Sequence, residues 1–268
     1  MLIIALTLGS FVGLVLGLTG AGGGILAVPA LTLGLGWSMT QASPIALLAV
    51  ACAAAIGSID GIRRGLVRIR AALLMSLTGI LAAPFGMSLA QALPEQWLIN
   101  IFAMVMLIVA VRLFRNASNN SSGDDLLTDS RSDTWKINAK TGRISWNATS
   151  ILTVGLIGMV SGVMTGLLGV GGGFIIVPAL LRYSNITIHG IIATSLMVIA
   201  LISAGAVIAA MAQGNVSMSI QAWIFIVASA AGMLIGRRLA EQIPRVYLQR
   251  IFAIGITFVS IILLYKNV

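Results

Sequence analysis

The sequence predicts an all-α polytopic integral membrane protein, built as an inverted-topology repeat with two broken re-entrant hairpins. Two observations predict it: charged residues are confined to short segments, and the chain contains an internal repeat. Of the 268 residues, 59% are hydrophobic and only 9% are charged, and the mean hydropathy is +1.06. Soluble domains carry about 25% charged residues, so this composition excludes an ordinary water-soluble protein.

The long stretches without Asp, Glu, Lys or Arg are residues 1–59, 71–94, 96–111, 144–181, 183–236 and 251–265. A helix needs roughly 20 apolar residues to cross the hydrocarbon core of a bilayer. The pattern therefore predicts full spans near Ala42–Ile59, Ala71–Ala92, Trp97–Leu113, Gly190–Met211, Ile220–Leu239 and Leu248–Tyr265.

An internal repeat divides the chain. Residues 13–31 and 162–180 align without a gap at an offset of 149 and are identical at eleven of nineteen positions. Both segments contain Gly-x-Gly-Gly-Gly followed by Pro-Ala-Leu. We expect a first membrane repeat at residues 1–115, a polar linker at 116–147 and a second, inverted repeat at 148–268. The linker is rich in Asn, Ser, Asp and Lys, which is typical of a solvated loop.

The arginine-rich segment lies in a different loop of the repeat in each half. Residues 60–70 contain four arginines, whereas the counterpart at 212–219 contains none. Conversely, residues 92–97 carry only Glu95 as a charge, whereas their counterpart at 236–250 contains four arginines. Basic loops face the cytoplasm under the positive-inside rule, so the halves are predicted to lie upside down relative to each other. We expect both termini outside and the central linker in the cytoplasm.

The opening stretch of each half is predicted to begin and end on one side of the membrane, because three spans already reverse the side. Residues 1–36 and 148–182 each read as a helix, a glycine break and a short return helix. A helix from Ile25 to Gly36 would be only about 18 Å long at 1.5 Å per residue. It would not cross a hydrocarbon core of about 30 Å, which favours re-entrant half-helices.

The glycine breaks are the strongest candidates for a binding site. Irregular backbone survives inside a bilayer only where protein buries it or it lines a cavity. Each break precedes a half-helix, whose N-terminal N–H groups and partial positive charge favour an anion. Inverted symmetry would bring both breaks to one central site. The candidate substrate-binding residues there are Gly20, Gly22, Gly23, Gly24, Gly169, Gly171, Gly172 and Gly173.

Three hydroxyl-bearing residues are candidates to complete that site. Ser43 follows the first return limb, while Thr194 and Ser195 occupy nearly the same place in the second half. Their hydroxyls could donate to an oxyanion. The alternative is that they bond back to the backbone of their own helix.

Other features indicate structural roles. Asp60, three residues before Arg63 and Arg64, is predicted to be an ion partner at a helix end, and His189 a surface residue. Small residues at GxxxG spacing often serve close helix packing in membranes. That interpretation is favoured for Gly13/Gly17 and Gly162/Gly166.

Several function classes find no support. Cys52 is the single cysteine and His189 the single histidine, so neither a disulfide nor a cluster of histidine metal ligands is expected. The sequence indicates no catalytic residues, metal site or cofactor, and the basic segments suit membrane anchoring rather than nucleic-acid binding. The protein is thus not expected to be an enzyme. A non-transporting scaffold or assembly protein, whose glycines only pack helices, remains an alternative, and a homo-oligomer stays open.

The paired Gly-x-x-x-Gly-Leu-x-Gly-x-Gly-Gly-Gly…Pro-Ala-Leu motifs, one near the start of each half, resemble the sulfite exporter TauE/SafE family, also called the toluene sulfonate uptake permease family. The resemblance covers essentially the whole chain except the linker. It implies a multi-pass transporter of the bacterial cytoplasmic membrane, moving sulfite, organosulfonates or other small sulfur-containing anions. Alternating access around the paired glycine loops is the expected mechanism.

The direction of transport is expected from charge alone. No charged residue falls in the middle of a predicted span, so the sequence indicates no buried proton relay. An interior-negative potential pushes an anion outward by about 2.3 kcal/mol per charge per 100 mV. An uncoupled anion carrier would therefore act as an exporter.

Overall fold

The computed structural model describes residues 1–20, 22–119, 148–184, 187–213, 218–240 and 245–266. All regular structure in these ranges is helical. The elements are α1 (Leu2–Thr19), the 3-10 helix η1 (Gly23–Leu26), α2 (Ala27–Gly34), α3 (Met39–Arg63), α4 (Ile69–Ala92), α5 (Glu95–Asn119), α6 (Ala148–Leu168), α7 (Gly173–Tyr183), α8 (Ile188–Ala212), α9 (Ile220–Ala240) and α10 (Arg245–Lys266).

Eight of the helices in the described ranges are long and apolar enough to cross a membrane. Six of them correspond to the predicted full spans, and the other two are the opening limbs α1 and α6. The return limbs α2 and α7 have 8 and 11 residues. At 1.5 Å per residue they extend only about 12 Å and about 17 Å, well short of a hydrocarbon core. The prediction of an all-helical membrane protein is confirmed.

The boundary of the predicted linker differs slightly. Helix α5 continues to Asn119, into the segment expected to be a loop from residue 116. The rest of the predicted linker, residues 120–147, lies outside the described residues. Parts of the basic-loop comparison, residues 214–217 and 241–244, lie outside them as well.

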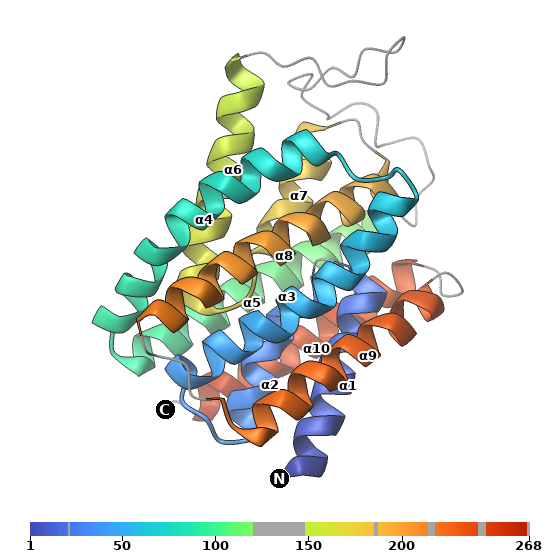
Figure 1. Ribbon diagram of the computed structural model, residues 1–268. Helices are drawn as coiled ribbons and strands as arrows, with labels where there is room; N and C mark the ends of the chain where they lie inside the picture. The colour runs from blue at the N-terminus through green and yellow to red at the C-terminus, as the bar shows by residue number, and fades with distance from the viewer. Residues whose placement is uncertain (21, 120–147, 185–186, 214–217, 241–244, 267–268) are drawn as a thin grey trace.

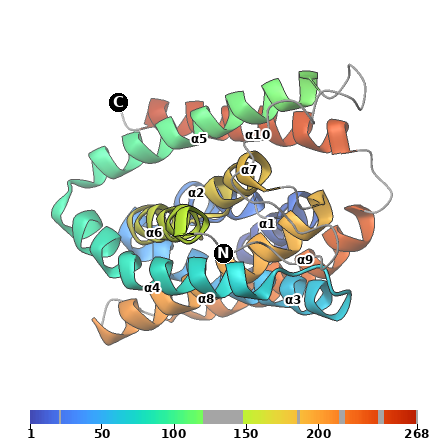
Figure 2. The same ribbon diagram turned by 90° about the horizontal axis from the view of Figure 1, so that it is seen from above.

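The helices form three layers (Figure 2). The pair α5 and α10 lies on one side, and the group α3, α4, α8 and α9 lies on the other. The interrupted pairs, α1 with α2 and α6 with α7, lie between these layers. Both glycine breaks are therefore covered by helices on two sides, which keeps their irregular backbone away from lipid.

Equivalent helices of the two halves make equivalent packing contacts. Helix α1 packs against α9 as α6 packs against α4, and α3 packs against α9 as α8 packs against α4. The central pair α3–α8 and the outer pair α5–α10 each join matching helices of the two halves. In Figure 1, α1 begins at the lower end of the molecule, whereas α6 begins at the upper end. The opening helices thus enter from opposite ends.

Close approach of backbones explains the pairing. A β-carbon built on Gly13 of α1 would lie 2.0 Å from the carbonyl oxygen of Ser229 in α9. A β-carbon on Gly162 of α6 would lie 2.1 Å from the carbonyl oxygen of Gly79 in α4. The next glycines repeat this approach: Gly17 against Met233, and Gly166 against Ala83. The prediction that these GxxxG glycines serve packing is confirmed, because only glycine fits there.

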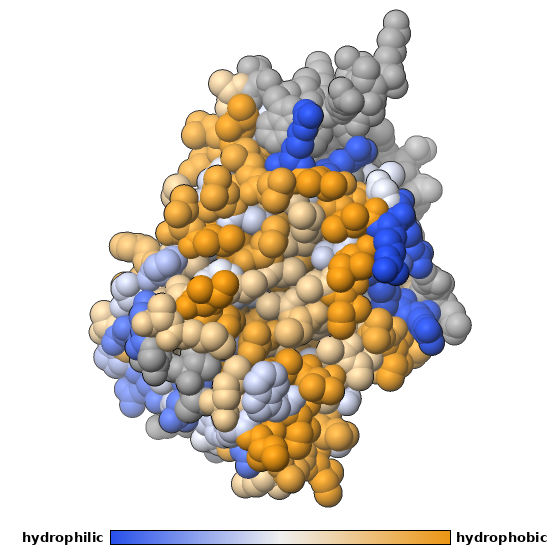
Figure 3. Space-filling model, viewed as in Figure 1, coloured by the Kyte–Doolittle hydropathy of each residue, from blue (hydrophilic) through white to orange (hydrophobic). Residues whose placement is uncertain are grey.

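Arginine-rich segments from both halves share one end of the molecule. Asp60 of α3 pairs with Arg64 at 3.0 Å and with Arg237 of α9 at 2.6 Å. Arg237 also donates to the carbonyl oxygen of Gly57. The predicted role of Asp60 as an ion partner is confirmed, and so is the exposure of His189. Figure 3 shows hydrophilic groups gathered near the junction of α3 and α4, beside a broadly apolar face.

The equivalent contact at the other end is uncharged. There α4 and α8 are joined by Gln91, whose Nε2 donates to Oε1 of Gln213 over 2.9 Å. Gln213 is the counterpart of Arg64 at the offset of 149. The two ends of the helix layer are therefore joined by interactions of different strength.

Candidate functional site

The two glycine loops, residues 20–24 and 169–173, meet inside the molecule. A β-carbon built on Gly24 would lie 3.1 Å from the carbonyl oxygen of Val170. Except for half-buried Gly22, and for Ala21, which is outside the described residues, every position of both loops is buried. The structure therefore places the first loop, at Gly24, against the second loop, at Val170.

The first break is a turn at Gly20 after which the backbone soon becomes helical again. After α1, Gly20 takes a positive φ of 75° and Gly22 returns to the right-handed helical region, with φ −81°. The 3-10 turn η1 runs directly into α2, because the N–H of Ala27 donates to the carbonyl oxygen of Gly24. The first half-helix is thus a 3-10 turn continued by α2.

The second break has a different backbone despite the same motif. Gly169, Gly171 and Gly172 all have positive φ, of 72°, 78° and 66°. Glycine adopts this region without a steric cost. Gly172 is the N-cap of α7, which then begins at Gly173. The second half-helix consequently starts abruptly at a left-handed turn.

Hydroxyl groups surround the second loop. Ser161 Oγ donates to the carbonyl oxygen of Gly172 over 3.2 Å, and Thr165 Oγ1 donates to the carbonyl oxygen of Ser161 over 2.7 Å. Ser43 of α3 lies against Gly169, where a β-carbon would meet its Oγ at 2.1 Å. These contacts hold the loop against α6 and α3.

Ser203 of α8 is the fourth hydroxyl at this loop. A β-carbon built on Gly171 would lie 2.9 Å from Ser203 Oγ, and the residue is 0% exposed. Among the described residues this hydroxyl has no hydrogen-bond partner. A buried polar group without a partner is costly, so Ser203 marks a place where a further acceptor or donor would be stabilised.

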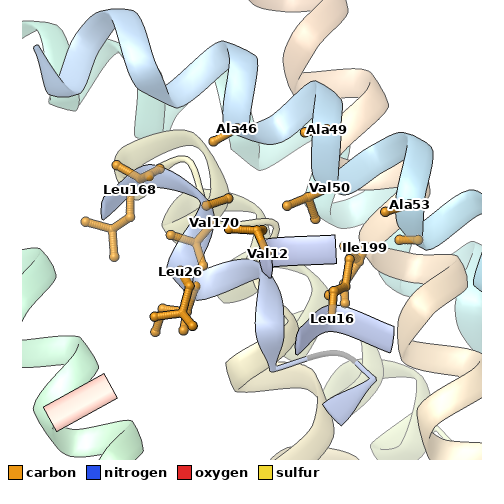
Figure 4. Close-up of a cluster of buried hydrophobic side chains, with 14 of the residues drawn as sticks. Val12, Leu16, Leu26, Ala46, Ala49, Val50, Ala53, Leu168, Val170 and Ile199 are labelled. Atoms are coloured by element: carbon orange, nitrogen blue, oxygen red, sulfur yellow. The ribbon is translucent and has the colours of Figure 1, made fainter. Parts of the chain in front are cut away.

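Aliphatic side chains surround the first loop. A β-carbon on Gly20 would meet Ile192 at 2.5 Å, and one on Gly23 would meet the backbone of Leu16 at 2.4 Å. Figure 4 shows Val12, Leu16 and Leu26 within a cluster of buried hydrophobic side chains that also includes Val170 of the second loop. The side chains in closest contact with the first loop are thus apolar.

The other two predicted hydroxyls lie elsewhere along α8. Thr194 Oγ1 accepts a hydrogen bond of 3.0 Å from the N–H of Arg68, at the start of α4. Ser195 Oγ donates to the carbonyl oxygen of Ile192 over 2.9 Å, which is the local backbone bond considered above as the alternative. Of the three predicted hydroxyls, only Ser43 contacts a glycine loop in this conformation.

The N-caps explain the different placement. Ser38 caps α3 and Thr187 caps α8, each accepting a bond from the N–H three residues later. These caps set the equivalence of α3 and α8 at the offset of 149, so Ser43 corresponds to Ile192 rather than to Thr194 or Ser195.

Sequence reasoning missed Ser161, Thr165 and Ser203. They could have been found by extending the alignment of the two halves, at the same offset of 149, beyond the motif along whole helices. At this offset their counterparts in the first half are Val12, Leu16 and Ala54. Hydroxyl-bearing residues of the second half thus correspond to apolar residues of the first.

A cavity of about 340 Å³ lies beside the first break, between α2, the N-terminal ends of α3 and α5, and α10. It reaches Val28 and Pro29, and its rim includes Trp37 and Glu95. Glu95 Oε1 accepts a bond of 2.7 Å from the N–H of Met39. No loop glycine lines this cavity. It approaches the first half-helix without opening the contact between the loops.

The family model for the sulfite exporter TauE/SafE family matches residues 5–263, nearly the whole chain. The chain belongs to the sulfite exporter TauE/SafE family. Two relatives from Xylella fastidiosa, strains 9a5c and Temecula1 / ATCC 700964, are each 28% identical over 99% of this chain and 96% of their own length. Both are described as a probable membrane transporter protein. No solved structure matches the chain.

Membership confirms the resemblance that the doubled motif indicates. A TauE/SafE protein is a membrane transporter, so this chain acts on a small-molecule substrate within a lipid bilayer. Among the described residues no group of three or more His, Cys, Asp or Glu side chains could hold a metal ion. The chemistry available at the glycine loops is hydrogen bonding by backbone N–H groups and hydroxyls.

Proposed function

We propose that this TauE/SafE protein carries small sulfur-containing anions, such as sulfite or organosulfonates, across the bacterial cytoplasmic membrane. The observation that carries the proposal is the meeting of the two glycine loops at the buried starts of two half-helices. A helix start offers N–H groups without partners inside the helix and a partial positive charge. Both properties suit an oxyanion.

The transport mechanism proposed is alternating access between inverted repeats. Two observations support it. The opening helix of each half packs against a helix of the other half, α1 against α9 and α6 against α4, and α1 and α6 begin at opposite ends of the molecule. In such repeats a central site stays fixed while one half rocks against the other. The re-entrant pairs α1–α2 and α6–α7 would then carry the site.

The proposed orientation has the arginine-rich end in the cytoplasm and both chain termini outside, following the positive-inside rule. The cavity beside α2 then opens toward the outside, since α2 leads away from the arginine-rich end to the end where Gln91 meets Gln213. The ion pair between Asp60 and Arg237 would hold the cytoplasmic end closed. This conformation would be one stage of the cycle, with the glycine loops occluded.

Purified protein reconstituted into liposomes tests the proposal. We expect saturable uptake of radiolabelled sulfite, competed by thiosulfate, sulfoacetate or taurine better than by chloride. An interior-positive potential, set with potassium and valinomycin, should accelerate uptake if transport is uncoupled. Protein-free liposomes are the control for leakage.

The alternative is a scaffold whose glycines only pack helices. Absence of saturable flux for every sulfur-containing anion, with folded protein in the liposomes, would overturn the transporter proposal in favour of that alternative. Flux that ignores the membrane potential would contradict uncoupled export while leaving transport itself in place.

A further inference from the structure

We propose that the anion is bound by the second loop alone, between the N-terminus of α7 and the hydroxyl of Ser203, while the first loop serves as a packing element. The inference rests on the proposed function and assigns its substrate contacts to one half of the repeat. It names Ser203 as a residue that touches substrate.

The start of α7 offers free backbone donors. The carbonyl oxygen of Gly172 accepts from the N–H groups of Ile175 and Ile176. Helix geometry leaves the preceding N–H groups, of Gly173 and Phe174, without partners inside the helix. With Gly172 left-handed and no side-chain cap at the helix start, these donors suit an anion.

Ser203 of α8 offers a hydroxyl donor that does not belong to the helix end. Its hydroxyl is completely buried, lies against Gly171 and has no hydrogen-bond partner in the described part of the chain. A sulfite or sulfonate group presents three acceptor oxygens. One of them can accept from Ser203 while the others accept from the backbone of α7.

Neighbouring hydroxyls position the loop rather than bind the anion. Ser161 and Thr165 already donate to backbone carbonyl oxygens, of Gly172 and of Ser161. The Ser161 donor is thus used in holding the left-handed turn at Gly172, while Thr165, whose donor stays within α6, lies against the same turn. Ser161 and Thr165 are therefore positioning residues, acting through the shape of the loop.

The first loop lacks the left-handed N-cap and the matching hydroxyls of the second. The counterpart of Ser203 is Ala54, and the counterparts of the positioning pair are Val12 and Leu16. Its half-helix begins with the 3-10 turn η1, and the side chains nearest its glycines are those of Ile192, Phe252 and Val50. The hydroxyl of Thr19, near Gly22, already donates to the carbonyl oxygen of Val15. An anion there would lose water without gaining a hydroxyl donor, which is unfavourable.

The test compares Ser203→Ala with Ser76→Ala and Ser229→Ala in the same liposome assay of sulfite uptake. The two control serines are also buried, and their hydroxyls also lack partners among the described residues. They lie in α4 and α9, away from the loop. We expect Ser203→Ala to raise KM about tenfold or more, as for a lost hydrogen bond to a charged group. The controls should stay within about twofold of the unmodified protein.

A second variant keeps the test decisive if Ser203→Ala folds poorly. Ser203→Cys preserves the size of the side chain with a weaker donor, so its KM should lie between those of the parent and Ser203→Ala. The shift of Tm on adding sulfite should shrink in the same order. These results would support the inference.

The outcomes separate the two proposals. If the unmodified protein transports sulfite and Ser203→Ala behaves like the control variants, the one-sided site is wrong while the transport function stands. If Ala54→Ser in the first half lowers KM severalfold, the first loop also binds the anion and the inference fails. If the folded parent transports no sulfur anion, the proposed function itself fails.

Discussion

The loops at residues 20–24 and 169–173 share one motif, but their surroundings and backbones differ. The first continues as a 3-10 turn among aliphatic side chains, and the second turns through three left-handed glycines among four hydroxyls. The close contacts of Gly13 and Gly17 in α1, by contrast, are matched by those of Gly162 and Gly166 in α6. The two halves therefore keep the same packing while the lining of their loops differs.

The ends of the helix layer differ in the same way. Asp60 and Arg237 form an ion pair between α3 and α9, whereas a neutral bond between Gln91 and Gln213 joins α8 and α4. An ion pair with a partly buried arginine is stronger than an exposed bond between amides. A movement between halves would open the uncharged end more readily.

The largest expected effect comes from the matched packing. Gly13→Leu and Gly162→Leu should each abolish the yield of folded, monodisperse protein, because backbone carbonyls lie where the side chain would go. Overpacking costs about 1–3 kcal/mol even where neighbours can shift, and here the neighbour is backbone. Size-exclusion profiles of detergent extracts measure the outcome. If only one of the two variants folded well, the α1–α9 and α6–α4 contacts would not be equivalent.

Substitutions beside the first loop and beside the second loop should differ in their effects on the free energy of unfolding and on KM. Leu16→Ala leaves a hole beside the first loop and should cost about 2–5 kcal/mol. Thr165→Val at the matching position beside the second loop loses one hydrogen bond and should cost about 1 kcal/mol. Unfolding in mixed detergent micelles measures both. We expect Leu16→Ala to leave KM for sulfite unchanged and Thr165→Val to raise it. The reverse pattern would assign the substrate to the first loop.

At the two ends of the layer, Arg237→Gln should lower the free energy of unfolding by about 1 kcal/mol. Gln91→Ala should change it by no more than about 0.5 kcal/mol. The same unfolding assay at low and high salt checks the cause, since salt screens only the charged end. Equal effects of the two substitutions at low salt would contradict the difference between the ends.

The smallest effect concerns a glycine outside the contact surface. A β-carbon on Gly155 would lie 3.7 Å from Thr78, an ordinary contact, and its counterpart in the first half is Leu6. Gly155→Ala should raise helix stability by up to about 1 kcal/mol. The matched control Gly158→Ala should destabilise, because its β-carbon would lie 2.3 Å from the carbonyl oxygen of Met75. Thermal unfolding of both variants measures this. A Gly158→Ala variant more stable than the parent would contradict close packing of α6 against α4 at this position.

Much of the fold could be predicted because the bilayer restricts what a chain can do. Apolar stretches long enough to span it must be helical, so composition and charge predicted the spans. The internal repeat predicted the packing glycines, because Gly13 and Gly162 occupy matching places in matching helices. The predicted ion partner Asp60 followed from its place next to arginines at a helix end.

The candidate site could be predicted only in part. The motif alone indicated that the loops would be buried helix starts, and the structure brings Gly24 and Val170 together. The motif could not indicate that Thr194 would bond to Arg68 at the start of α4. In an apolar helix the spacing of hydroxyls does not say which neighbour each one faces, because that depends on how the helix is rotated.

By itself, the sequence determined the membrane class, the duplicated halves, the helix breaks and the glycines that allow close approach. Only the tertiary structure decided that the identical motifs adopt different backbones, and that Ser203 lies unpartnered against Gly171. The physical reason is that glycine permits several conformations at nearly equal energy. The choice among them is made by the side chains packed around each loop, such as Ser161 and Ser203 at the second loop, which only the tertiary structure brings there.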